Sequence, residues 1–467
     1  MNKRDLQNRY ILFDIISALI VWILFVVFRK TINDIHLFGA SSFILPFSYY
    51  LFSFLLFPVC CVFVHFLTGF YQNSLRQSRV NAILTTLSAS AIVSLSVFFV
   101  LKLGDVVISL KYFYFSLLVL FLLMFFVTNF FRSLIFSHIR HSFRIKKLTN
   151  NVLIIGIGNK AQKLAIDFER TIGQFTLIGF ISLEKKEGFY EKNVLGNMDD
   201  LDTIVRNYKV QETIIALEDD VNDKLLYEII SKLYKYNIGI HYVPRLQDIL
   251  AGSAKMSYIS NLSLVTITNH SMSAWELNIK RVMDISISFV SLLLLTPFMI
   301  FIMIRVKLDS KGPIFYRQER IGRYGKPFFI YKFRTMYVGS EGGTPQLSSE
   351  NDNRITPLGS MLRKYRIDEI PQFYNIIKGD MSLVGPRPER LFYITQIEEQ
   401  APYYCLLYKI RPGLTSWGPI KIGYSDSIQK MVERLNYDII YLDSMSLIND
   451  LKIMIYTVEI ILNGKGV

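Results

Sequence analysis

The chain has 467 residues, of which 51% are hydrophobic, and it carries a formal net charge of +14. The length is enough for two or three domains, and the apolar content exceeds that of a typical soluble protein, so we expect a membrane protein. The positive charge then indicates an anionic membrane surface or a phosphorylated substrate rather than nucleic acid. The three cysteines, Cys60, Cys61 and Cys405, give no spacing for a disulfide framework or a zinc site, which fits a reducing cytoplasm for the soluble parts.

Four apolar segments fill the first third of the chain, at about residues 10–28, 46–68, 82–103 and 112–131. Each is long enough to cross the hydrocarbon core of a bilayer as a helix. Lys and Arg gather before the first segment, between the second and third, and after the fourth. Because cytoplasmic loops carry the excess of these residues, we predict a four-helix transmembrane region over residues 1–148 with both of its ends inside the cell.

Residues 149–250 have the pattern of a Rossmann-like α/β domain. Buried strands alternate with helical segments, and the first strand runs into the turn Gly156-Ile157-Gly158-Asn159-Lys160-Ala161. This Gly-x-Gly-x-x-Ala turn has two interpretations: it holds a pyrophosphate at a helix N-terminus, or its glycines only allow a tight turn between strand and helix. Because such a loose pattern is weak evidence alone, the second is favoured. Residues 251–279 are predicted to be a linker.

A fifth apolar segment, at residues 282–304, is interrupted by Thr296-Pro297. Proline removes a helical hydrogen bond, so a kink is expected there. Four cationic residues flank the segment on its two sides: Lys280, Arg281, Arg305 and Lys307. Because cationic flanks tend to stay in the cytoplasm, this symmetry favours a re-entrant helix that enters the membrane and returns. A Pro-kinked helix that spans the bilayer is the alternative, and it would place the rest of the chain outside the cell.

The stretch RIDEIPQFYNIIKGDMSLVGPRPE, at residues 366–389, concentrates charges around two turns. Asp368 and Glu369 stand just before Pro371, which suits the first turn of a helix, so one interpretation is that the two acids only cap that helix. Three arginines close by in sequence favour chemistry instead: Arg363, Arg366 and Arg387. Guanidinium groups hold phosphate oxygens with paired hydrogen bonds, and two adjacent carboxylates bind a hard divalent cation or act as nucleophile and helper. Together these groups predict phosphoryl transfer.

From about Lys280 to the C-terminus the chain resembles the bacterial polyprenyl-phosphate sugar-1-phosphate transferases, the monotopic phosphoglycosyl transferases. The motifs that carry the resemblance follow the family's order: KRVMDIS, GPIFYRQERIG, YKFRTM, RIDEIPQFYNIIKGDMSLVGPRPE, RPGLTSWG and LNYDIIYLDSMSLINDLKIM. With four spans and an α/β domain in front, the layout is similar to the long form of the family, which starts capsule, exopolysaccharide or O-antigen repeat units. The resemblance implies an α-rich catalytic domain over residues 280–467, at the cytoplasmic face of the bacterial inner membrane.

The resemblance also implies a reaction. In the family, a sugar-1-phosphate passes from a UDP-sugar to a polyprenyl phosphate, usually undecaprenyl phosphate, and UMP leaves. The first acid of an Asp-Glu pair attacks the phosphate that bears the sugar and forms a covalent phosphosugar intermediate. Carried onto this chain, Asp368 would be the nucleophile and Glu369 its partner in assistance or in binding Mg²⁺, so that both acids are candidate metal ligands.

Further residues carry over from the family's motifs. Arg363 and Arg387 would hold phosphates; Lys332 and Arg334, from YKFRTM, are weaker candidates, because a cation between aromatic residues commonly snorkels at a membrane surface. Thr296-Pro297 replaces the Ser-Pro pair at which the family's re-entrant helix is kinked, and keeps a hydroxyl that can bond a freed carbonyl. The implied partners are a UDP-sugar, undecaprenyl phosphate and membrane lipids, with a homodimer as a further expectation and no nucleic acid.

The sequence departs from the family after its RPG turn, where residues 415–419 read TSWGP and lack the Gln of relatives, so the contacts of that loop are expected to differ. Two other functions remain to be weighed. A membrane-anchored nucleotide-sugar dehydratase or epimerase is similar through the first 245 residues, and Tyr374 and Lys378 have the Tyr-x-x-x-Lys spacing of that class. No second Gly-rich turn precedes them at a suitable distance. A non-enzymatic scaffold for polysaccharide assembly, in which Asp368 only caps a helix, is the third possibility.

Overall fold

A computed structural model describes most of the chain. The described residues are 3–28, 47–71, 79–104, 110–144, 150–170, 175–183, 194–218, 223–234, 236, 238–244, 256–259, 262–266, 272–340, 345–347, 352–423 and 427–464. The chain forms two compact units, and the first combines Met1–Leu148 with Ser273–Ile279. The second combines Thr149–Met272 with Lys280–Val467.

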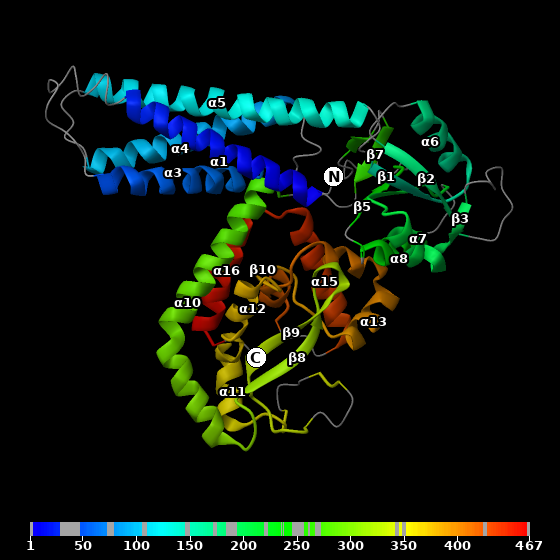
Figure 1. Ribbon diagram of the computed structural model, residues 1–467. Helices are drawn as coiled ribbons and strands as arrows, with labels where there is room; N and C mark the ends of the chain where they lie inside the picture. Colours follow the sequence, from blue (N-terminus) through cyan, green and yellow to red (C-terminus); the bar gives the residue numbers. More distant parts are fainter. Residues whose placement is uncertain are drawn as a thin grey trace. The chain divides into compact units, whose positions relative to one another are not determined.

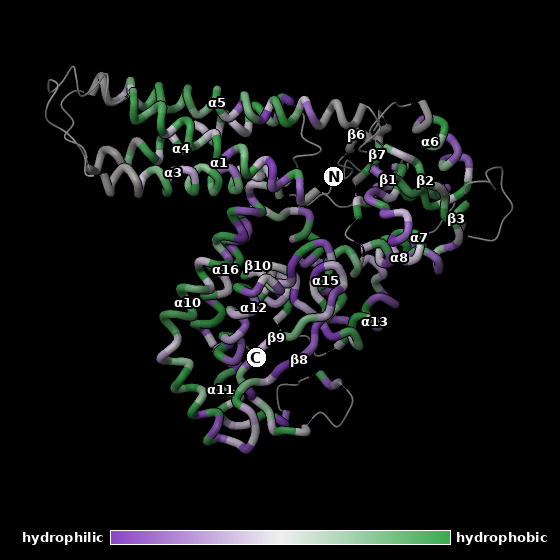
Figure 2. Tube along the Cα trace, viewed as in Figure 1, coloured by the Kyte–Doolittle hydropathy of each residue, from purple (hydrophilic) through white to green (hydrophobic). Residues whose placement is uncertain are grey.

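The first unit contains the four N-terminal apolar helices that the sequence predicts, and they carry the hydrophobic colour of Figure 2. They are α1 (Lys3–Phe28), α3 (Phe47–Leu67), α4 (Arg79–Gly104) and α5 (Leu110–Arg144). Helices α1, α4 and α5 are long and apolar enough to cross a membrane, and α3 has a shorter apolar helical stretch in its described part. Helix α5 continues beyond the predicted end at residue 131, because a helix need not stop where its apolar span ends.

One buried polar cluster ties three of these helices together. Arg132 of α5 donates hydrogen bonds to Asp14 of α1, the shorter at 2.6 Å, and to the hydroxyl of Thr86 of α4 at 2.7 Å. The guanidinium also lies over the ring of Phe70, 3.6 Å from its centroid. A charge inside an apolar bundle is costly unless it is paired, so this cluster fixes how α1, α4 and α5 pack.

The second unit begins with a seven-stranded sheet in strand order β3-β2-β1-β4-β5-β7-β6. Its strands are β1 (Asn150–Ile155), β2 (Phe175–Ser182), β3 (Val194–Asn197), β4 (Glu212–Ile215), β5 (Gly239–Tyr242), β6 (Met256–Ile259) and β7 (Leu262–Thr266). The first five are parallel, in the order that a Rossmann fold uses. The last two are antiparallel and lie within residues 251–279, the stretch predicted as a linker. The alternating polar pattern there is that of an edge hairpin, which completes the sheet.

Helices cover both faces of this sheet (Figure 1). Helix α6 (Asn159–Arg170) packs on one face, while η3 (Met198–Asp200), α7 (Leu201–Asn207) and α8 (Asp223–Tyr234) belong to the other side. A parallel strand covered on both faces is apolar along its whole length. Accordingly, residues 152–155 of β1 are fully buried.

The C-terminal part of the second unit is mainly helical with two small sheets. Its helices and turns are α10 (Ala274–Asp309), η4 (Arg323–Gly325), α11 (Pro357–Lys364), η5 (Ile367–Glu369), α12 (Gln372–Lys378), α13 (Leu391–Gln400), η6 (Pro402–Lys409), α14 (Trp417–Lys421), α15 (Ile428–Asp443) and α16 (Leu447–Leu462). Antiparallel strands β8 (Phe315–Ile321) and β9 (Pro327–Phe333) form one sheet, and parallel strands β10 (Ser382–Val384) and β11 (Gly413–Thr415) form the other.

Helix α10 runs through Thr296-Pro297 without ending, and it changes direction along its course (Figure 1). The hydroxyl of Thr296 donates to the carbonyl of Leu292 at 2.6 Å. The expectation was that this hydroxyl would bond the carbonyl freed by the proline. Pro297 has no N–H to donate to the carbonyl of Leu293, so that is the freed carbonyl. The hydroxyl of Thr296 instead bonds the carbonyl one residue earlier, which already accepts a helical hydrogen bond. Both features bend a helix, so the bend has an identified cause.

One stripe of α10 packs on the C-terminal part and the rest is exposed and apolar. Ile302 and Val306 are buried with Phe333 of β9 and Leu362 of α11. Around them α10 exposes large apolar side chains: Phe289, Val290, Leu293, Leu294, Phe301, Ile304 and Leu308. A contiguous apolar surface of this size indicates a partner or a membrane.

Candidate active site

The start of α10 holds the two segments that carry the candidate site residues. Arg281 donates to the carbonyl of Ile376 at 2.8 Å, near the end of α12. Asp284 accepts from the hydroxyl of Ser382 at 2.7 Å and from the N–H of Leu383 at 3.0 Å, both in β10. Helix α12 follows the acid pair directly, and β10 leads into the turn that carries Arg387. The apolar helix and the acid pair therefore form one rigid arrangement.

The acid pair sits in a strained local backbone. Arg366, just before η5, has a φ of 52°, in the left-handed region that a side chain rarely adopts, and such strain gathers at functional sites. Asp368 and Glu369 follow within η5, each only 7% exposed. Helix α12 then runs from Gln372 to Lys378. The acids are buried rather than placed on the surface as simple helix caps, because the turn directs them inward.

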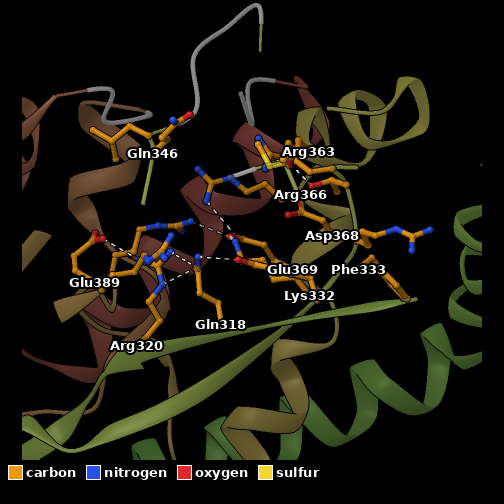
Figure 3. Close-up of a pocket in the computed structure, with 18 of the residues that line it drawn as sticks. Gln318, Arg320, Lys332, Phe333, Gln346, Arg363, Arg366, Asp368, Glu369 and Glu389 are labelled. Atoms are coloured by element: carbon orange, nitrogen blue, oxygen red, sulfur yellow. Dashed lines mark hydrogen bonds and ion pairs between the residues drawn. The ribbon is translucent and has the colours of Figure 1, made fainter. Parts of the chain in front are cut away.

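Glu369 binds two cations that the sequence singles out (Figure 3). The ammonium of Lys332 lies 2.7 Å from its Oε1, and Nη2 of Arg387 lies 3.0 Å from the same oxygen. Arg366 is more distant, with Nη1 3.8 Å from Oε2. Lys332 comes from β9 and Arg387 from the Gly-Pro-Arg-Pro turn, so the fold brings together residues that lie far apart in sequence.

The two carboxyl groups have opposite pKa shifts. Burial raises the pKa of Asp368 to about 6, against the opposing charges of Lys332, Arg363 and Arg387, and the negative charge of Glu369 adds to the rise. Burial also acts to raise the pKa of Glu369, but the charges of Lys332, Arg387 and Arg366 outweigh it and hold this pKa well below its usual value. Two carboxyl groups with separated pKa values are typical of sites in which each has its own role.

The remaining two sequence candidates have different surroundings. Arg363, on α11, donates from Nε to the hydroxyl of Thr335 at 2.9 Å and lines the same pocket as the acids. Arg334 also lines the pocket, but its Nη2 donates to the carbonyls of Val306 and Ser310 at 3.1 and 2.6 Å. The carbonyl of Val306 belongs to the last turn of α10 and that of Ser310 directly follows it, so this guanidinium caps the end of that helix.

The pocket that holds the acids has a volume of about 530 Å³, and it contains a second polar cluster that sequence reasoning missed. Glu389 pairs with Arg320 of β8 at 3.0 Å and with Arg434 of α15. Figure 3 shows this cluster across the pocket from Asp368. The sequence signal for this cluster was Glu389, which directly follows Arg387-Pro388. Its partners lie far away along the chain and could not be identified from spacing.

The acid pair fits a magnesium ion better than a metal that needs a full protein cage. Within the described ranges, no group of three or more His, Cys, Asp or Glu side chains is arranged to hold a metal. Magnesium is commonly held by one or two carboxylates together with substrate phosphates. The side chain of Asp368 has no hydrogen bond or ion pair among the contacts of the described residues. Glu369 uses Oε1 for both of its close cations. Each acid therefore keeps at least one carboxylate oxygen that could bind a metal ion.

In the α/β domain, the Gly-rich turn is filled by the chain itself. The backbone N–H of Lys160, at the start of α6, donates to Oε1 of Glu218 at 3.1 Å. A Cβ at Gly158 would lie 2.3 Å from the same carboxylate oxygen. The carboxylate thus stands where a Rossmann fold would place a pyrophosphate. Gly156, with a φ of +114°, serves the tight turn.

Two other features of the sequence lie away from the pocket. Tyr374 is 53% exposed and Lys378 pairs with Asp380 at 2.7 Å, so neither lines the pocket that contains Asp368. In the loop that departs from relatives, Trp417 donates to Asn449 of α16 at 3.1 Å. This loop therefore packs its aromatic residue on α16.

Comparison with known proteins gives two family matches. Residues 275–464 match the bacterial sugar transferase family, and residues 66–244 match a CoA-binding domain family. A UDP-glucose:undecaprenyl-phosphate glucose-1-phosphate transferase of Caulobacter vibrioides is 37% identical over 185 residues, which are 39% of this chain and 69% of the relative.

Two further relatives have related names. A UDP-N-acetylgalactosamine-undecaprenyl-phosphate N-acetylgalactosaminephosphotransferase of Aeromonas hydrophila is 34% identical, over 49% of this chain and 54% of the relative. A UDP-glucose:undecaprenyl-phosphate glucose-1-phosphate transferase of Escherichia coli is 30% identical, over 61% of each chain. The chain thus matches between about half and two thirds of the length of these two relatives.

Proposed function

The chain belongs to the bacterial sugar transferase family, and we propose that it transfers a sugar-1-phosphate from a UDP-sugar to undecaprenyl phosphate, with release of UMP. The observation that carries the proposal is the buried acid pair, with Asp368 beside a Glu369 that is bound to Lys332 and Arg387. Such a site offers one carboxylate for attack and several cations for phosphate oxygens. The family's named members act on UDP-sugars and undecaprenyl phosphate, which supports the choice of substrates.

We propose a reaction in two displacements at one phosphorus. An oxygen of Asp368 attacks the phosphorus that carries the sugar, the bond from this phosphorus to the UMP oxygen breaks, and UMP leaves with the electron pair. An oxygen of undecaprenyl phosphate then attacks the same phosphorus. The bond to Asp368 breaks, which releases the diphosphate-linked sugar and restores the carboxylate.

The cations of the pocket have distinct roles in this scheme. Lys332 and Arg387 neutralise the charge that develops on the phosphate oxygens, and Arg363 holds the donor diphosphate at the opposite side of Asp368. Asp368 and Glu369 would hold Mg²⁺, which, when bound, neutralises phosphate charge further. We assign Arg334 to fixing the end of α10, because its Nη2 is bonded there.

The acceptor determines where the site must lie. Undecaprenyl phosphate keeps its chain in the bilayer, so the acid pair must work at the membrane surface. We propose that α10 enters the inner membrane from the cytoplasmic side and returns at its bend, which would place its exposed apolar side chains in lipid. The UDP-sugar then reaches Asp368 from the cytoplasm and the acceptor reaches it from the membrane. This reaction would be the first step of building a polysaccharide repeat unit.

The test is incubation of the purified protein with a radiolabelled UDP-sugar and undecaprenyl phosphate. We expect label in the lipid extract and UMP in the aqueous phase in equal amounts. The relatives are named for glucose and N-acetylgalactosamine, so these two donors are the first to compare. A keto-sugar nucleotide without UMP would show a dehydratase instead, and neither product would be the result for a scaffold. A homodimer is also proposed, and the mass of the protein in detergent tests it.

A further inference from the structure

Asn375, on α12, has a side chain that reaches across to β9. Its Nδ2 donates to the carbonyl of Phe329 at 2.7 Å, and its Oδ1 accepts from the N–H of Tyr331 at 3.2 Å. The residue is fully buried. An amide carries one donor and one acceptor side by side, and alternate residues of a strand present their backbone groups on the same edge. Asn375 therefore pairs with β9 as a neighbouring strand would.

This pairing lies next to a contact of the acid pair. Lys332, the neighbour of Tyr331 in β9, extends its ammonium to Glu369, on η5 directly before α12. The same two segments are thus joined twice: by the amide of Asn375 on the backbone of β9, and by the ion pair of Lys332 with Glu369. The rings of Tyr331 and Tyr374 meet edge to face, 5.8 Å apart, and add a third contact between them.

The pairing of Asn375 with the backbone of β9 controls the ion pair of Lys332 with Glu369 for a physical reason. A lysine side chain is long and mobile, so an ion pair alone does not fix the strand from which it extends. Two hydrogen bonds to backbone atoms do fix it, and their loss would leave a part-buried carbonyl and a part-buried N–H without these partners. Among the described residues β9 pairs with β8 alone, so on its other edge the amide of Asn375 on α12 takes the place of a further strand.

We propose that Asn375 is a positioning residue of the site: its amide fixes β9 against α12 and thereby holds the ammonium of Lys332 on Glu369. The inference rests on the proposed sugar-phosphate transfer and adds a residue outside the reacting groups. Asn375 does not line the pocket that contains Asp368. It acts through Lys332.

The consequence is a loss of kcat rather than of substrate binding. The ammonium of Lys332 lies 2.7 Å from Oε1 of Glu369, beside the acid that is proposed to attack. If β9 moves and Lys332 withdraws, the charge that develops on the phosphate oxygens loses one of the cations that neutralise it. We therefore expect kcat to fall while the KM for the UDP-sugar changes by less than about threefold.

The test compares Asn375→Leu, which removes both hydrogen bonds, with Asn449→Leu as a matched control. Asn449 bonds Trp417 in the same part of the chain and lies away from the pocket. We expect both variants to unfold at lower temperature, because each loses side-chain hydrogen bonds that join separate segments. Only Asn375→Leu should also lose about tenfold or more in kcat with little change in the KM for the UDP-sugar, since only this residue positions a charge at the acids. An unchanged kcat in Asn375→Leu would overturn the proposal.

A double-variant cycle with Lys332→Met tests whether Asn375 acts through that residue. Residues that act through one another do not have additive effects. In the Lys332→Met background, Asn375→Leu should therefore change kcat less than about threefold; multiplied losses would contradict the proposal. Asn375→Asp keeps the acceptor for Tyr331 and serves the same comparisons if the leucine variant does not fold. Wild-type release of UMP is measured first, so failure of the proposed function is separate from failure of the positioning role.

Discussion

The ammonium of Lys332 lies 2.7 Å from Oε1 of Glu369, and Nη2 of Arg387 lies 3.0 Å from the same oxygen. Glu369 thus keeps its charge because two cations surround it, while Asp368 beside it is buried with a raised pKa. This difference assigns the two acids separate roles. In the proposed reaction, Asp368 would supply the attacking oxygen, and Glu369 would order the cations that receive the phosphate.

Arg387→Lys should lower kcat/KM by about 10- to 100-fold. Lysine keeps the positive charge but has no planar fork for a phosphate and a carboxylate at once. Arg387→Ala should lose more, because the charge is removed as well. The measurement is UMP release under initial-rate conditions. Arg317→Lys is the control: Arg317 is an exposed residue over the ring of Phe329, outside the pocket, and should retain wild-type rates. Equal losses in the two lysine variants would contradict a phosphate role for Arg387.

The pH profile should report the ionisation of Asp368. A carboxylate attacks only when ionised, and the pKa of Asp368 is raised to about 6. As pH falls through this value the nucleophile becomes protonated, so kcat/KM should decrease about tenfold for each further pH unit. Glu369 should not contribute to this limb, because its pKa is held well below the usual value. A profile that stays flat from neutral pH down to about pH 4.5 would conflict with this assignment.

Arg334→Met should lower stability without changing the KM for the UDP-sugar. Arg334 is 6% exposed and its guanidinium bonds two carbonyls at the end of α10, and such charge-assisted bonds contribute about 1.5–3 kcal/mol each to stability. The melting temperature in detergent is the measurement. A large rise in KM with an unchanged melting temperature would return Arg334 to the phosphate-binding role that the sequence first suggested.

The sequence predicted the elements whose signal is local. The four apolar helices follow from hydropathy, and the parallel strands follow from short apolar runs between turns. Asp368 and Glu369 were identified from a motif, and the structure brings Lys332 and Arg387 to them. The cluster of Glu389 with Arg320 and Arg434 was missed, because its members lie on separate segments of the chain.

The sequence could not predict how certain side chains are used in three dimensions. The YKFRTM motif places Lys332 and Arg334 close together, yet one reaches Glu369 and the other reaches the end of α10. Positions two apart on a strand face the same side, but β9 ends at Phe333, so Arg334 lies past the strand and does not follow this alternation. Likewise, the Gly-rich turn gave no sign that Glu218 would occupy its helix N-terminus, because that contact depends on the neighbouring strand.

The membrane topology is tested with two cysteines placed on either side of α10. In a variant without native cysteines, Asp202→Cys precedes α10 and Glu399→Cys follows it, and both positions are exposed. A re-entrant helix should leave both labelled by an impermeant maleimide from the cytoplasmic face alone. If α10 spans the membrane instead, the two positions will be labelled from opposite faces, and the acid pair could not meet a cytoplasmic donor.

The most direct test of the account is to trap the sugar phosphate on the protein. Incubation with UDP-sugar labelled in the sugar, without acceptor lipid, followed by rapid denaturation should leave label on the wild type and on Asp380→Asn, a control acid from the same stretch. Asp368→Asn should carry no label and release no UMP, because an amide does not attack phosphorus. Full labelling of the Asp368→Asn variant would contradict the central claim and place the nucleophile elsewhere.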